Sequence, residues 1–184
     1  MSSLITLVGQ QPSAVAVTVA TLAKNVELER VRLMHTKKTQ AEAQRLQSYI
    51  KEISPKTAKI DLYPISVNLQ RSEGEQPTIW DRIDKVLQEK EFPRPVYYDI
   101  SPGLNFHVAL AARNLGEDIS GLTPVYADDQ HLRCVGGDQR WDLEEVDAAS
   151  LLKLYGFTPP EKKLLPAGDI VKTVETASVE PLLQ

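Results

Sequence analysis

Three short stretches of the sequence carry groups that can hold an anion. Residues 9–13, 36–39 and 101–105 are rich in amides, hydroxyls and lysines, and each follows a segment that predicts a strand. Hydrogen-bond donors of these kinds suit phosphate oxygens and the edges of nucleobases. None of the three stretches contains a carboxylate, so the pair of acids that general acid–base chemistry uses is missing. The residue types therefore predict a site that binds a phosphate-bearing ligand.

The third stretch joins a strand pattern to a helix pattern. Residues 95–100 are apolar and β-rich, a Ser-Pro-Gly turn follows at residues 101–103, and apolar residues then recur at helical spacing over 106–112. Such a unit places backbone N–H groups and the positive end of a helix dipole in front of an anion. Pro102 fixes its own backbone, while Gly103 allows a ligand to come close. The same pattern is also typical of an ordinary β–α connection in any α/β protein.

The elements that must position these turns alternate along the chain. Strands are predicted at residues 4–8, 31–35, 59–65, 95–100 and 123–127, and helices at 14–24 (with Ser13 as N-cap), 41–53, 77–87 and 106–112. This alternation predicts a Rossmann-like, doubly wound α/β fold with a mainly parallel sheet and flanking helices. Because parallel strands end at the same edge of a sheet, the three turns are expected to form one site.

The last third of the sequence no longer alternates between strand and helix patterns. Residues 131–135 and 139–143 flank Gly136-Gly137-Asp138, which predicts a β-hairpin, and a short helix follows over about 146–155, ended by Gly156. We therefore divide the chain into a ligand-binding domain at residues 1–129, a hairpin-and-helix extension at 130–157, and a linker or tail at 158–184.

Composition narrows the class of protein. The chain has 184 residues, 42% of them hydrophobic and 25% charged, which is typical of a globular domain. The formal charge of −4 argues against a general nucleic-acid coat. Cys134 is the single cysteine, so we expect neither a disulfide framework nor a cysteine-based zinc site, and we expect no metal or cofactor. No apolar run approaches the roughly 18 residues that a membrane span needs, and no signal peptide is evident, which predicts a soluble, cytoplasmic protein.

Several familiar enzyme classes are not indicated. The first turn reads VGQQPS and lacks the G-x-G-x-x-G fingerprint of dinucleotide-binding dehydrogenases, and the phosphate-binding motif G-x-x-x-x-G-K-[ST] is absent. The G-x-S-x-G and H-E-x-x-H motifs of hydrolases and zinc proteases are also absent.

Some candidate residues also have a plain structural interpretation. Lys37 and Lys38 could be the solvated start of a helix, and His35 is expected to be satisfied by the backbone at a strand end. His107, early in a helix, could belong either to the core or to the site.

Three segments together resemble a known family. LITLVGQQPSAV, LMHTKKTQAEAQRL and DISPGLNFHVALAA are similar to the CRISPR-associated Rossmann fold (CARF) domain, and above all to the sensor halves of type III CRISPR ancillary nucleases. In that family a strand ending in VG-x-x-P opens the domain, a T-[EK]-x-T turn follows the second strand, and a T-G-G-T-K-like turn follows the fourth. The hairpin and the helix ending in LYGF also resemble the segment that leads from sensor to effector there.

The resemblance implies a homodimer that binds a cyclic oligoadenylate, most often the four-membered ring (cA4), across its two-fold axis. The ligand-binding residues would be Gly9, Gln10, Gln11, Ser13, Thr36, Lys37, Lys38, Thr39, Ser101, Pro102, Gly103, Leu104 and Asn105. The sequence departs from the family pattern in the third turn, where Asn105 stands in place of lysine and Pro102-Gly103 in place of a glycine pair. Loss of that charge leaves the affinity, the ring size and any cleavage of the ring open.

Three functions remain in competition. The first is a second-messenger sensor, and the second is a metal-independent ring nuclease, for which Lys37, Lys38, Ser101 and Asn105 are the candidate catalytic groups. The third is a Rossmann-like domain that binds another nucleotide. Related proteins carry an effector domain after the sensor, and residues 157–184 supply no cluster of carboxylates for one. We therefore expect either a sensor fragment of a longer chain, in which the tail at 158–184 leads to an effector domain, or a domain that stands alone and binds or cleaves the ring. We expect the dimer to form through the small-residue face of residues 14–23 and through residues 108–112.

Overall fold

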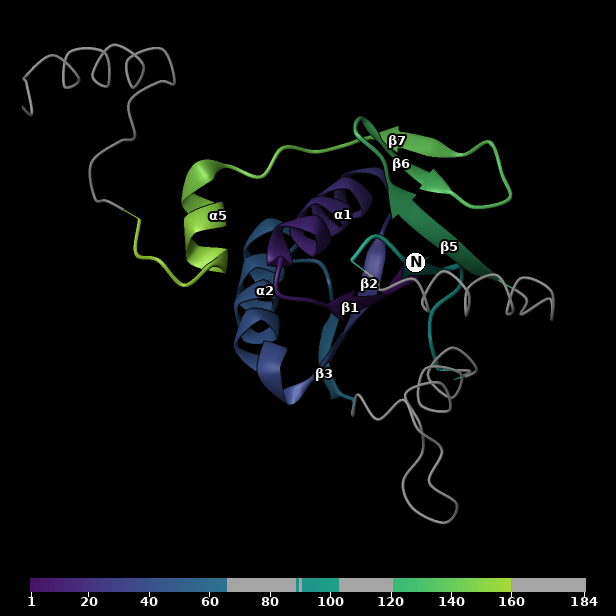
Figure 1. Ribbon diagram of the computed structural model, residues 1–184. Coiled ribbons are helices and arrows are strands. Elements are labelled where there is room, and N and C mark those ends of the chain that lie inside the picture. Colours follow the sequence, from purple (N-terminus) through teal and green to yellow (C-terminus); the bar gives the residue numbers. More distant parts are fainter. Residues whose placement is uncertain (66–88, 90, 103–120, 160–184) are drawn as a thin grey trace, which may run out of the picture.

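The described residues form one twisted, mainly parallel sheet. The computed structural model describes residues 1–65, 89, 91–102 and 121–159, and these contain a seven-stranded sheet of order β3-β2-β1-β4-β5-β6-β7. The parallel strands are β1 (Ser2–Val8), β2 (Leu28–His35), β3 (Lys59–Pro64), β4 (Val96–Asp99) and β5 (Leu122–Ala127). The antiparallel strands are β6 (His131–Cys134) and β7 (Arg140–Asp142). The predicted Rossmann-like α/β fold is confirmed (Figure 1).

β1 lies at the centre of the sheet and fixes its register. It pairs with β2 on one side, where Val8 is opposite His35, and with β4 on the other, where Thr6 is opposite Asp99. All seven of its residues are buried. A parallel strand covered on both faces has this pattern, which explains the unbroken apolar run in the sequence.

Two helices cover one face of the sheet. These are α1 (Pro12–Asn25) and α2 (Gln40–Ile53), which is preceded by the short 3₁₀ helix η1 (Lys37–Thr39). They bury residues at helical spacing, for example Val15, Val19 and Leu22 of α1, against the even-numbered residues of β1. A further helix, α5 (Ala148–Leu154), packs on the outer side of α2 (Figure 1).

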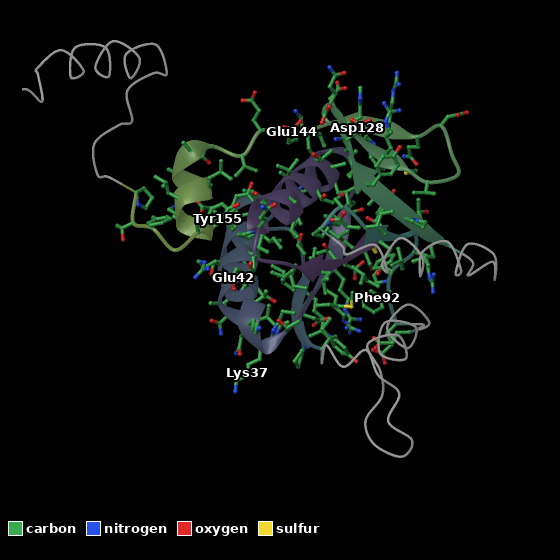
Figure 2. The ribbon with its side chains drawn as sticks, in the orientation of Figure 1. Lys37, Glu42, Phe92, Asp128, Glu144 and Tyr155 are labelled. Atoms are coloured by element: carbon green, nitrogen blue, oxygen red, sulfur yellow. The ribbon has the colours of Figure 1, made fainter. Side chains whose placement is uncertain are left out.

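The opposite face of the sheet combines apolar and charged residues. Phe92 lies there, on the side away from α1 and α2 (Figure 2). The guanidinium groups of Arg30 and Arg32 stack on its ring at 4.2 and 4.6 Å, and both side chains are buried. Asp61 accepts hydrogen bonds from Arg30, and Glu89 accepts one from Arg32. Burial of these two arginines is therefore compensated by opposite charges and by an aromatic face.

The hairpin and the last helix form as the sequence predicts. β6 and β7 continue the sheet beyond β5, and Gly136 between them has a positive φ of 81°. Gly156, with a φ of 83°, follows the end of α5 as the expected C-terminal glycine.

Other expectations differ from the structure or lie outside it. Ser13 is not the N-cap of α1; Gln11 holds that position, because Pro12 with its fixed φ starts the helix. The helices predicted at 77–87 and 106–112, His107, and the tail after residue 159 lie outside the described residues. In the part of the chain that the structure describes, no helix is long and apolar enough to cross a membrane.

We expect Asp147→Ala to lower the free energy of unfolding by about 1 kcal/mol at neutral pH, as is typical of a lost N-cap. The Asp147 carboxylate accepts hydrogen bonds from the backbone N–H and the hydroxyl of Ser150, and these bonds lower its pKa. A carboxylate whose pKa is lower in the folded state stabilises the fold above its unfolded pKa, and that contribution is lost as the pH falls through the folded pKa. Urea denaturation over a range of pH should therefore show the gap between wild type and variant closing in acid. Asp138→Ala, in the exposed hairpin turn, is the control, and an equal effect there would contradict the assignment.

Candidate functional site

The candidate site lies where the winding of the sheet reverses. From β1 the chain proceeds to β2 and β3 on one side, and β4 then lies on the other side of β1. Ligands of open α/β sheets bind in the crevice outside the carboxyl ends of the strands at such a switch point. The site is therefore expected beyond the ends of β1 and β4.

The structure has a hollow at that place. Its volume is about 550 Å³, within the range typical of ligand pockets. The residues that line it come from the ends of β1, β2 and β4 and from the first turn of α1: Leu7, Val8, Gly9, Gln10, Gln11, Ala14, Thr36, Thr39, Ser101 and Pro102. All three turns that the sequence singles out thus contribute to one hollow.

The backbone of the first turn, residues 9–13, borders free space. A Cβ atom placed on Gly9 would meet one neighbour, the carbonyl oxygen of Pro102 at 3.8 Å, which is an ordinary contact, and Gly9 does not have a positive φ. The fold therefore does not require glycine here, and the free space belongs to the hollow. Gln11, the N-cap of α1, makes no side-chain capping bond. Pro12 has no N–H, so the backbone N–H groups of Ser13 and Ala14 and the positive end of the dipole are the ones available to an anion.

The second turn is held by its own hydroxyls. Thr36 Oγ1 accepts a hydrogen bond from the backbone N–H of Lys38 at 3.2 Å, and Thr39 Oγ1 accepts one from the N–H of Thr36 at 3.1 Å. This capping box satisfies the start of η1 and fixes both threonines at the wall of the hollow.

The two lysines lie beside the hollow and do not line it. Lys37 and Lys38 are exposed in η1, between Thr36 and Thr39, and neither has an ion-pair partner among the described residues. Figure 2 shows the Lys37 side chain extending away from the ribbon. They add positive charge at the rim.

The third turn rests on a buried carboxylate. Asp99 ends β4 and is fully buried, and its Oδ1 accepts a hydrogen bond from the backbone N–H of Ser101 at 2.9 Å. Its Oδ2 accepts one from Thr6 Oγ1 at 3.1 Å. Burial raises the pKa of the Asp99 carboxyl, although the hydrogen bonds from Ser101 and Thr6 oppose that shift. Ser101 Oγ in turn accepts a hydrogen bond from the N–H of Ala127 at 2.8 Å.

Asp99 and Thr6 are the residues that sequence reasoning missed. An aspartate two residues before a serine in a turn can accept the backbone N–H of that serine, and this spacing was the available signal. Gly103, Leu104 and Asn105, predicted for the rest of the turn, lie outside the described residues.

Two further candidates have partners away from the hollow. His35 is buried, and its Nδ1 lies 3.1 Å from the carbonyl oxygen of Thr36, which confirms that the backbone satisfies it. Ser13 Oγ is 3.0 Å from the hydroxyl of Tyr155, so this side chain connects α1 to the end of α5 and does not line the hollow.

The described part of the site is suited to binding. It offers amides, hydroxyls and a helix N-terminus, and its one carboxylate, that of Asp99, is fully buried. Among the described residues, no group of three or more His, Cys, Asp or Glu side chains could hold a metal ion.

Comparisons by sequence find no relative of the chain. No protein-family model matches it, and no curated protein matches it.

Comparisons by structure find several proteins with the same fold. Can2 from Sulfobacillus thermosulfidooxidans in complex with cyclic tetra-adenylate matches 96% of this chain and 46% of its own length, with a TM-score of 0.65 and 15% identity. A type III CRISPR defence DNA nuclease activated by cyclic oligoadenylate matches 95% of this chain and 26% of its own, with a TM-score of 0.55 and 19% identity. Enterococcus italicus Csm6 bound to cyclic hexa-2′-fluoro-hexa-dAMP matches 70% of this chain and 33% of its own, with a TM-score of 0.52 and 12% identity.

This chain spans less than half the length of each of those three proteins. At these identities the likeness is one of fold. It confirms, at the level of the fold, the resemblance to CARF domains that the three sequence segments indicate.

Proposed function

We propose that this chain is a sensor domain of type III CRISPR defence that binds a cyclic oligoadenylate, with cA4 as the first candidate. The observation that carries the proposal is the single hollow at the switch point of the sheet, lined by residues from all three predicted turns. The fold it shares with proteins bound to, or activated by, cyclic oligoadenylates supports the same ligand class.

The hollow has the chemistry that such a ligand needs. The uncapped first turn of α1 suits a phosphate, and the hydroxyls of Thr36 and Thr39 and the side chains of Gln10 and Gln11 suit phosphate oxygens and base edges. Lys37 and Lys38 at the rim would attract the polyanion from solution.

The proposed ligand also suggests how the chain assembles. A cyclic oligoadenylate with an even number of identical units has a two-fold axis, so we propose a homodimer in which each subunit offers the same turns. Light scattering at micromolar protein, with and without ligand, tests this assembly, and a monomeric mass in both cases would contradict it.

The direct test is a titration of the protein with cyclic tetra-adenylate and cyclic hexa-adenylate, followed by chromatography of the recovered ligand. Tight binding with intact ligand supports the sensor. Linear products would instead select the ring nuclease. Binding of neither ring would refute both and favour a domain for another nucleotide.

We expect Lys37→Ala or Lys38→Ala to weaken binding of cA4 by about tenfold. From the rim, either lysine side chain would have to turn toward the bound ligand to reach a phosphate; a hydrogen bond to a charged partner contributes about 1.5–3 kcal/mol, and tenfold corresponds to about 1.4 kcal/mol. The affinity of each variant should also depend less on salt, because one screened charge is gone.

Titrations at two salt concentrations measure both effects. Lys51→Ala, an exposed lysine in the last turn of α2, is the matched control and should bind as wild type does. Unchanged affinity in both rim variants would mean that the phosphates are held elsewhere. In that case the affinity of Asn105→Ala should be compared with that of the wild type.

A further inference from the structure

Asp99 is a fully buried carboxyl group that the fold alone does not explain. Its side chain is 0% exposed, and no ion pair joins it to a lysine, arginine or histidine of the described part of the chain. Burying a carboxyl group without a cation is unfavourable, and an apolar residue at the end of β4 would avoid that penalty. Its presence therefore calls for an explanation in terms of what the carboxylate holds.

The carboxylate holds the wall of the hollow. Oδ1 accepts the N–H of Ser101, and Oδ2 accepts the hydroxyl of Thr6 in β1. The same turn is joined to β5, because the N–H of Ile100 donates to the carbonyl oxygen of Val125 at 2.9 Å and Ser101 Oγ accepts the N–H of Ala127. The third turn is thus tied to β1, β4 and β5 through one buried network.

This network holds part of the lining of the hollow. Ser101 and Pro102 line it next to Gly9, where an added Cβ would be in contact with the Pro102 carbonyl oxygen at 3.8 Å. A displaced third turn would change the shape of the hollow at this point.

We propose that Asp99 is a positioning residue, which fixes Ser101 and Pro102 so that this part of the hollow keeps the shape that the ligand needs. The inference rests on the proposed function for the identity of the ligand. Asp99 acts through the turn, not by contact with the ligand, since its carboxyl group is fully buried and does not line the hollow.

Substitutions of Asp99 can either keep or remove its hydrogen bonds to the turn and to β1. In Asp99→Asn the amide oxygen can still accept the N–H of Ser101, and the hydroxyl of Thr6 can rotate to accept from the amide NH₂. In Asp99→Ala both partners lose their acceptor. Thr21→Val is the matched control, because it removes a buried hydroxyl of α1 that accepts the N–H of Glu144, away from the hollow.

Two measurements on the full chain test the inference. Titration with cyclic tetra-adenylate should show at least a tenfold loss of affinity in Asp99→Ala and less than a twofold change in Asp99→Asn and Thr21→Val. Amide hydrogen exchange of the ligand-free proteins should be at least tenfold faster at Ser101 and Ala127 in Asp99→Ala, and unchanged there in the other two.

Each alternative outcome is informative. If Asp99→Ala matches Thr21→Val in both measurements, Asp99 is merely structural and the inference is wrong. If Asp99→Asn loses as much as Asp99→Ala, the hydrogen bonds that asparagine can keep are not what fixes the turn, and the inference is again wrong. If Asp99→Ala does not fold, Thr6→Val takes its place, because it removes the hydrogen bond from Thr6 to Asp99; a loss of affinity with faster exchange at Ser101 would support the inference, and values equal to those of Thr21→Val would overturn it. If the wild type binds no cyclic tetra-adenylate, the proposed function fails, while the exchange measurement still decides whether Asp99 positions the turn.

Discussion

Gly9→Val is expected to weaken binding of the cyclic oligoadenylate by about a hundredfold and to leave the fold intact. The new Cβ would meet the Pro102 carbonyl oxygen at an ordinary 3.8 Å, and Gly9 has no positive φ that valine would strain. The rest of the side chain would occupy space that the ligand needs. A hundredfold loss corresponds to about 2.7 kcal/mol, which lies within the range for overpacking a filled site.

The measurement is a titration with cA4 beside a thermal melt of each protein. Gly9→Ala should fall between wild type and Gly9→Val, because it adds a single methyl group. Gly137→Val is the matched control, since this hairpin glycine also has open space around its Cβ position and lies far from the hollow. Wild-type affinity in Gly9→Val would show that the ligand does not enter this hollow.

Asp61→Ala is expected to lower the free energy of unfolding by about 3 kcal/mol. Asp61 Oδ2 lies 2.7 Å from the guanidinium of Arg30 and 3.5 Å from that of Arg32, and both arginine side chains are less than a tenth exposed. Removing one partner of a buried ion pair leaves an uncompensated charge, which typically costs about 3–5 kcal/mol. Glu89 remains beside Arg32, so we take the lower end of that range.

Chemical denaturation measures this effect. Asp142→Ala provides the comparison, because Asp142 is also on a strand but its side chain is 96% exposed. That variant should change stability by less than about 0.5 kcal/mol. If both variants lose equally little, stacking on Phe92 would be sufficient to stabilise the two arginines.

The sequence predicts the strands well where their burial is complete. The run at residues 4–8 has no polar interruption except Thr6, and it is found in β1. The strand begins two residues earlier than predicted, because the hydroxyls of Ser2 and Ser3 are buried through hydrogen bonds to the carbonyl oxygens of Glu27 and Pro93. Because these hydrogen-bond partners are distant in the sequence, no local pattern indicates that the two serines belong to the strand.

The start of β2 also depends on residues that are distant in the sequence. It begins at Leu28, three residues earlier than predicted, and includes Arg30 and Arg32. Arginines in a strand usually indicate a solvated face, but here Phe92, Asp61 and Glu89 from distant segments make their burial possible.

The position of the site could be predicted from the sequence, but many of its side-chain contacts could not. Turns at the ends of parallel strands must meet, so Gly9, Thr36 and Ser101 could be grouped from topology alone. The hydroxyl of Ser13 could not be assigned in this way, since Tyr155, its partner, is 142 residues away. The supporting role of Asp99 required its burial to be seen.

The central place of β1 has a consequence for the order of folding. β1 and β2 are joined by α1 alone and can pair early, whereas the contact between Thr6 and Asp99 closes a loop of 93 residues. Pairings of such long range form slowly, because chain entropy is lost before the contacts compensate for it. The hollow needs both pairings, so we expect the ability to recognise a ligand to appear only in the final step of folding.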